Sequence, residues 1–253
     1  MRIVISPAKK LHEGYALPDV EATQPRFLSQ SQNLINILQE KDSFEIASLM
    51  KLSMKLADLN AGRFQSWHTP FTTTNAKQAL FSFAGDVYQG LDATSLSTND
   101  IAFAQEHLRM LSGLYGLLRP LDLMQPYRLE MGTRLTNPEG SNLYDFWGKQ
   151  ITEQLNQELS TGDTLINLAS NEYFKVLNPK LLQANIITPA FKENKAGTYK
   201  VVGIFAKKAR GFMSRYIIQN RITDVEDIKT FNVDGYIYNP SLSDATTWAF
   251  SRG

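Results

Sequence analysis

Three arginines surround a pair of closely spaced glycines near the middle of the chain. Gly113 and Gly116 are separated by two residues, and Arg109, Arg119 and Arg128 lie within about twenty residues of one another. A glycine turn can expose its backbone N–H groups, because glycine tolerates positive φ and has no Cβ to hold a ligand away. Backbone amides in such a turn bind anions, phosphate groups included. The pattern therefore predicts a partner that carries phosphate.

A second basic stretch lies between Glu193 and Asp224, where the chain has no acidic residue. At about 100° per residue, Met213 and Ile217 fall on one face of a helix that starts near Lys207. The opposite face is basic and consists of Lys207, Lys208, Arg210, Arg215 and Arg221. A helix with one apolar and one basic face is typical of contact with a phosphate backbone. The alternative is a solvated basic face paired with acids elsewhere in the fold.

Two lysines follow the first predicted strand. Residues 1–5 are mainly apolar and end at Ser6 and Pro7, which predicts a buried strand, and Lys9 and Lys10 come directly after it. Ligands of open α/β sheets bind beyond the carboxyl ends of the strands. Lys9 is therefore a candidate phosphate contact, and two solvated loop lysines are the alternative.

Three carboxylates could do acid–base chemistry within such a basic site. Asp86 follows Gly85, Glu130 lies between Arg128 and Gly132, and Glu172 is expected in the first turn of a short helix; neighbouring charge can shift the pKa of a carboxyl group. The sequence alone favours a different role for Asp86, which is to cap the turn that follows it. Tyr88 or Tyr127 could stack on a base. Because no known catalytic spacing is present, an enzyme acting on a nucleotide, base or nucleic acid is the alternative hypothesis.

The apolar periodicity predicts a single compact domain over residues 1–253 of the α+β (mixed α/β) class, with a mixed β-sheet flanked by helices. The predicted helices cover residues 27–40, 44–51, 54–67, 101–111, 143–159 and a stretch from 207 onward. The predicted strands cover residues 1–5, 80–83, 164–168, 186–191 and 199–205, with shorter ones near 237 and 247–250. Residues 11–26 are expected to form a long loop, and Ser97 is expected to cap the helix that follows it.

The composition excludes several classes of protein. The net charge of +1 means that any nucleic-acid surface is a local patch. With no cysteine there is no disulfide, thiolate metal site or cysteine nucleophile. The three widely spaced histidines suit no helical di-iron site, so we expect no metal and no cofactor. No apolar run is long enough for a membrane span or a signal peptide, which predicts a soluble, cytoplasmic protein. We expect it to be a monomer.

Several short strings also resemble those of a known family. Residues 5–9 (ISPAK), 85–88 (GDVY) and 207–211 (KKARG), together with the glycine-containing stretch 107–132, resemble the bacterial peroxide stress resistance protein YaaA family over nearly the whole chain. The resemblance implies protection against hydrogen peroxide, linked to lower intracellular iron. It also implies DNA binding in a basic cleft through a helix-hairpin-helix-like element at about residues 98–125. A helix C-cap followed by a turn would need the same glycines.

Together these patterns favour a DNA-binding stress-response protein that contacts the phosphate backbone with little sequence specificity. The residues predicted to contact DNA or phosphate are Lys9, Lys10, Arg109, Gly113, Gly116, Arg119, Arg128, Lys207, Lys208, Arg210 and Arg215.

Overall fold

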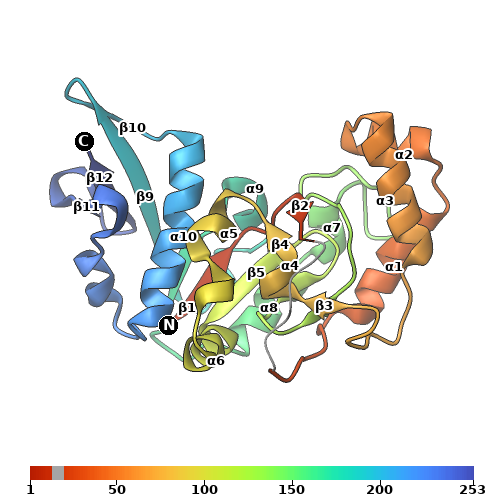
Figure 1. Ribbon diagram of the computed structural model, residues 1–253, viewed down its shortest axis with the longest axis horizontal. Coiled ribbons are helices and arrows are strands. Elements are labelled where there is room, and N and C mark those ends of the chain that lie inside the picture. Colours follow the sequence, from red (N-terminus) through yellow and green to blue (C-terminus); the bar gives the residue numbers. More distant parts are fainter. Residues whose placement is uncertain (13–19) are drawn as a thin grey trace.

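Strand β1 (Arg2–Ile5) lies inside the main sheet of the computed structural model, which describes residues 1–12 and 20–253 (Figure 1). Within the described residues the sheet has eight strands in the order β11-β12-β9-β8-β1-β5-β6, and β10 pairs with β9. Ile3 of β1 is in register with Leu108 on one side and Ile166 on the other, and all three side chains are fully buried. Val4 and Ile5 are buried as well, so both faces of β1 are covered, which explains why the strand is apolar.

The sheet is mixed, as predicted. Strands β5, β1, β8, β9 and β12 are parallel neighbours, and β6, β10 and β11 pair antiparallel. The other strands of this sheet are β5 (Leu108–Ser112), β6 (Gly116–Leu118), β8 (Thr164–Leu168), β9 (Asn185–Lys195), β10 (Thr198–Lys200), β11 (Ile237–Tyr238) and β12 (Thr247–Arg252). Two small ladders pair β2 (Lys10–Leu11) with β4 (Phe83–Ala84) and β3 (Lys77–Gln78) with β7 (Leu123–Met124).

Helices flank the sheet and extend the molecule at one end, where α1–α3 stand together away from β9–β12 (Figure 1). The α-helices are α1 (Leu28–Gln39), α2 (Ser43–Met50), α3 (Met54–Ser66), α4 (Ala79–Ser82), α5 (Asp86–Leu91), α6 (Thr98–His107), α7 (Leu143–Trp147), α8 (Gln150–Asn156), α9 (Asn171–Phe174) and α10 (Gly203–Gln219). Short 3-10 helices cover Ala93–Ser95, Val225–Thr230, Val233–Gly235 and Pro240–Leu242. The predicted fold class is confirmed, and no described helix is both long and apolar enough to cross a membrane.

The predicted helix over residues 101–111 is wrong in its last part. Ser97 caps α6 as predicted, accepting a hydrogen bond from the backbone N–H of Asp100, but the helix ends at His107. Residues 108–112 form β5, whose five residues are all buried beside β1. A fully buried strand and one face of a helix can share the same apolar spacing, so periodicity alone does not separate them.

The helix-hairpin-helix prediction over residues 98–125 is therefore also wrong, because the segment is one helix followed by a β-hairpin. Strands β5 and β6 pair antiparallel, with Ser112 opposite Gly116. Gly116 has φ of +68°, and a Cβ there would lie 2.8 Å from the ring of Trp147. The hairpin therefore requires glycine at this position, because any side chain would collide with the Trp147 ring.

Other predicted elements also differ from the observed ones, either in type or in where they begin and end. Residues 80–83 were predicted as a strand but belong mostly to helix α4, and the predicted helix 143–159 breaks at Gly148 into α7 and α8. The predicted strand 199–205 stops at Lys200, and α10 begins at Gly203, before the predicted start at Lys207. Residues 13–19 of the predicted 11–26 loop lie outside the described residues.

Helices α5 and α10 cross at two glycines. A Cβ at Gly211 would lie 1.9 Å from the carbonyl oxygen of Val87, and one at Gly90 would lie 2.2 Å from that of Lys208. Gly211→Ala is therefore expected to lower the free energy of unfolding by roughly 1–3 kcal/mol through overpacking, as measured by urea denaturation. Gly203→Ala is the matched control, because a Cβ there meets nothing within 4 Å. Equal stability of the two variants would contradict this crossing.

Candidate functional site

The loops that follow β1 and β8 are joined at the carboxyl edge of the sheet. Ser170, just after β8, donates its backbone N–H to Ser6 Oγ at 2.9 Å, and the two hydroxyl oxygens are 3.3 Å apart. Tyr88 of α5 donates its hydroxyl to the carbonyl oxygen of Ser6 at 3.0 Å. These bonds fix the chain just before Lys9. Lys9 therefore lies beyond the carboxyl end of a parallel strand, where α/β proteins commonly bind ligands.

Glu130 links two of the predicted cations. Its carboxylate lies 2.6 Å from Lys9 Nζ and 3.2 Å from Arg128 Nη2. The Lys9 side chain is 62% exposed, whereas the side chains of Arg128 and Glu130 are 16% and 22% exposed. Arg128 Nε is buried and has no hydrogen-bond partner within the described part of the chain. Lys9 is thus accessible to solvent while it is paired with Glu130, and the Arg128 guanidinium has a buried donor that is not used.

We call the space around these cations the cationic hollow. Its volume is about 560 Å³, and it is lined by Lys9, Lys10, Leu11, His12, Leu56, Leu59, Arg63 and Arg128. The loop after β1, the strand β2, the helix α3 and the segment after β7 each contribute residues to it. Burial, followed by the positive charge of Lys10, lowers the pKa of His12, which favours its neutral form near pH 7.

Two of the three candidate carboxylates line a neighbouring hollow of about 730 Å³. Glu130 and Glu172 contribute to it together with Lys51 and Arg134. Glu172 accepts a hydrogen bond from the backbone N–H of Gly132 at 2.9 Å. Asp86 lies in the first turn of α5, directly after Gly85. The structure therefore brings Glu130 and Glu172 to one hollow, and Asp86 belongs to a helix start.

The tyrosines considered for base stacking are buried. Tyr127 shares a hydrogen bond of 2.6 Å with Ser112 Oγ, and its ring lies among other aromatic side chains. Burial raises the pKa of both Tyr88 and Tyr127 well above the ordinary value, so both stay neutral. Because both rings are enclosed, they hold the site together rather than offer a face to a ligand.

Arg109 and Arg119 do not reach the cationic hollow. Arg109 is 4% exposed, and its Nε lies 2.5 Å from a carboxylate oxygen of Glu158, which also contacts Arg26. Arg119 Nη2 contacts the buried Asp122 carboxylate at 2.8 Å. Strand β6 runs back toward the start of β5, so both arginines lie away from the carboxyl edge that leads to Lys9. Their charges neutralise acids of the protein itself.

Gly113 and Gly116 lie inside the hairpin. Both are buried, and the carbonyl oxygen of Gly113 accepts a hydrogen bond from Trp147 Nε1 at 3.0 Å. The backbone N–H of Tyr115, which lies between the two glycines, donates to Ser112 Oγ at 3.0 Å. These glycines serve internal packing, and the hairpin is not an open cradle for phosphate.

The basic helix is confirmed as an amphipathic element. In α10, Met213 and Ile217 are fully buried, whereas Lys207 and Lys208 are exposed. Arg215 donates to the carbonyl oxygens of Leu91 and Asp92 at 3.0 and 2.9 Å, which joins α10 to the end of α5. Arg210 is partly buried, and that burial lowers its pKa. Contact between these cations and a polyanion stays a prediction.

Sequence reasoning missed Arg63, His12 and Leu59. Arg63 and Leu59 lie on α3, whose apolar spacing predicts a helix that packs against the core. No local feature of the sequence distinguishes either residue. Only the placement of α3 opposite β2 brings them to the same hollow as Lys9.

These features define a mixed α/β protein with a cationic hollow beyond the carboxyl ends of its parallel strands. The chain belongs to the peroxide stress protein YaaA family, whose sequence model matches residues 1–242. It is 59% identical to a UPF0246 protein of Hahella chejuensis, over the whole chain and 99% of that relative. The chain is also 58% identical to UPF0246 proteins of Aliivibrio fischeri strain MJ11 and Colwellia psychrerythraea. Each match spans the whole chain, and it covers 98% of the first relative and 99% of the second. The family description supports a role in peroxide stress.

Proposed function

We propose that this protein acts in peroxide stress by binding the sugar–phosphate backbone of DNA in the cationic hollow. The observation that carries the proposal is the meeting of Lys9, Lys10, Arg63 and Arg128 around one space, although α3 and the segment after β7 are far from β1 in sequence. Lysine and arginine around a concave surface raise the local concentration of polyanions. We also propose that a link to lower intracellular iron, which the sequence resemblance implies, depends on this DNA binding.

The hollow suits phosphate groups rather than base edges. Arg128 brings a guanidinium whose side chain is 16% exposed, and Lys9 brings an ammonium group whose side chain is 62% exposed. Phosphate contacts position a protein on DNA without reading its sequence. Binding is therefore proposed to be nearly independent of sequence. Lys207 and Lys208 on α10 are proposed as a further, separate contact.

Salt dependence tests this function. A dye-labelled 20-base-pair duplex is titrated with the protein at several salt concentrations, and the affinity is read from fluorescence anisotropy. About four phosphate contacts predict that log K falls with log salt with a slope of about −3.6. A salt-independent affinity, or no binding to paired, gapped or single-stranded DNA, would overturn the proposal.

An enzyme acting on a nucleotide or nucleic acid is the second candidate, because Glu130 and Glu172 line one hollow beside these cations. Glu130→Gln separates the two functions. In the binding function Glu130 competes with phosphate for Lys9 and Arg128, so the variant is expected to bind DNA about fivefold more tightly, or about 1 kcal/mol. In the enzymatic function the variant would retain binding and lose a product that the unmodified protein forms, as followed by chromatography of the incubated DNA or nucleotide.

A further inference from the structure

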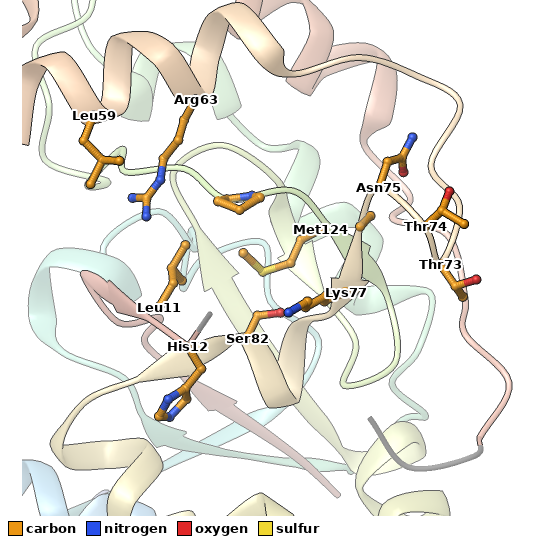
Figure 2. Close-up of a pocket in the computed structure, with 12 residues that line it drawn as sticks. Leu11, His12, Leu59, Arg63, Thr73, Thr74, Asn75, Lys77, Ser82 and Met124 are labelled. Atoms are coloured by element: carbon orange, nitrogen blue, oxygen red, sulfur yellow. The ribbon is translucent and has the colours of Figure 1, made fainter. Parts of the chain in front are cut away.

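A third cavity, which we call the apolar slot, opens beside the cationic hollow. Its volume is about 340 Å³, and its walls include Leu11, Leu59, Met124 and Pro126 (Figure 2). Leu11, His12, Leu59 and Arg63 line both spaces, so the slot and the hollow are adjacent. A ligand with an anionic part and an apolar part could therefore occupy both at once.

Leu59 gives the slot an apolar wall that the protein leaves partly uncovered. Leu59 is 46% exposed on α3, whereas Met124 of β7 is only 2% exposed. Figure 2 shows Leu59 and Arg63 projecting from α3 toward Leu11, with the side chain of Met124 extending into the space between the elements. An apolar group that fills the space between Leu59 and Met124 is bound favourably, because its binding removes apolar surface from water.

The size and surroundings of the slot select its ligand. A volume of about 340 Å³ lies at the lower end of the range for small-molecule sites, roughly 300–1,000 Å³, and is too small for a base pair within a stacked duplex. A nucleotide combines a flat, largely apolar base with an anionic phosphate. With its phosphate beside Lys9 and Arg128, its base would lie near Leu11 and Leu59.

We propose that the apolar slot receives one unpaired or extruded base of a DNA strand whose backbone lies in the cationic hollow. The proposal rests on the DNA binding proposed above. A base inside a duplex reaches a pocket only by leaving the stack, which costs less where the base is already unpaired. The slot has room for one base and not for a base pair, so it selects for the unpaired state, and polar residues that also line it, among them Asn75 and Ser82, can contact the base edge. The structure thus assigns DNA with bulged or single-stranded nucleotides as the preferred substrate class.

The test compares two duplexes that differ at one nucleotide. One is fully paired, and the other carries a single bulged 2-aminopurine, with a dye at the far end of each for anisotropy. The bulged duplex is expected to bind about tenfold more tightly at equal salt. Its 2-aminopurine emission is expected to rise severalfold on binding, because the base leaves its stacked neighbours.

Leu59→Trp fills the slot from an exposed helix position, so the fold should tolerate it. This variant is expected to bind both duplexes within about twofold of each other and to lose the rise in emission. Because Leu59 also lines the cationic hollow, the readout is the ratio of the two affinities within one variant, which cancels any change in backbone binding. Met54→Trp is the control, since Met54 is 40% exposed on the same helix and does not line the slot. Equal binding of both duplexes by the unmodified protein, with unchanged emission, would overturn the slot while DNA binding stands. No binding to either duplex would overturn both proposals.

Discussion

Replacing Lys9 and Arg128 together by alanine is expected to weaken binding to paired DNA about 100-fold at low salt. Each cation supplies a charged hydrogen bond to phosphate worth about 1.5 kcal/mol or more, so two lost contacts amount to about 3 kcal/mol. The double substitution also leaves Glu130 without its two cations, which adds repulsion. The salt slope should become shallower by about 1.8, or 0.9 for each contact. Fluorescence anisotropy across a salt series measures both quantities.

Two further variants locate the DNA. Lys207→Ala with Lys208→Ala removes the same amount of charge from the exposed face of α10. Lys149→Ala removes an exposed lysine that pairs with Glu153 on the surface. If the α10 variant weakens binding as much as the variant in the hollow, DNA lies along α10 as well. If Lys149→Ala does so, the binding is non-specific attraction to surface charge, and the hollow has no special role.

The same variants test the proposed link to iron in cells. Cells carrying Lys9→Ala with Arg128→Ala are expected to survive peroxide less well and to hold more intracellular iron than cells carrying Lys149→Ala. Survival after a peroxide pulse and total iron by mass spectrometry are the two readouts. Normal survival and iron in cells whose variant no longer binds DNA would separate the stress role from DNA binding.

Arg109→Met is expected to destabilise the protein by about 3–5 kcal/mol, the cost of removing one partner of a buried ion pair. The side chains of Arg109 and Glu158 are 4% and 8% exposed, and Arg109 also donates to the carbonyl oxygens of Gln105 and Leu108. When Arg109 is removed, the buried Glu158 carboxylate keeps only its contact with Arg26, whose side chain is more exposed. The free energy of unfolding from urea denaturation measures the effect, and a change below about 1 kcal/mol would contradict the buried pair.

Arg109→Met combined with Glu158→Met should recover much of the lost stability, because an apolar pair can replace a buried ion pair of similar volume. The double variant also tests where DNA binds. Arg109 lies away from the cationic hollow, so the folded double variant should bind DNA like the unmodified protein. A large loss of affinity in a stably folded double variant would return Arg109 to the binding surface.

Much of the fold was predictable because its signals are local. The apolar run of β1, the capping residue Ser97 and the two faces of α10 depend on residues a few positions apart. The stretch 108–112 was misread because its apolar spacing suits a helix as well as a strand buried on both sides. The register with β1 decides between the two, and that register joins residues about a hundred positions apart.

The sequence by itself determined the amounts and types of charge, including an arginine on each side of the glycine turn and two lysines after the first strand. Only the tertiary structure decided how each charge is used. Arg109 is paired with Glu158, 49 residues further along, whereas Arg128 lies beside the lysine that follows β1. The physical reason is that the energy of a charge depends on its burial and on its nearest opposite charge, and chain folding fixes both.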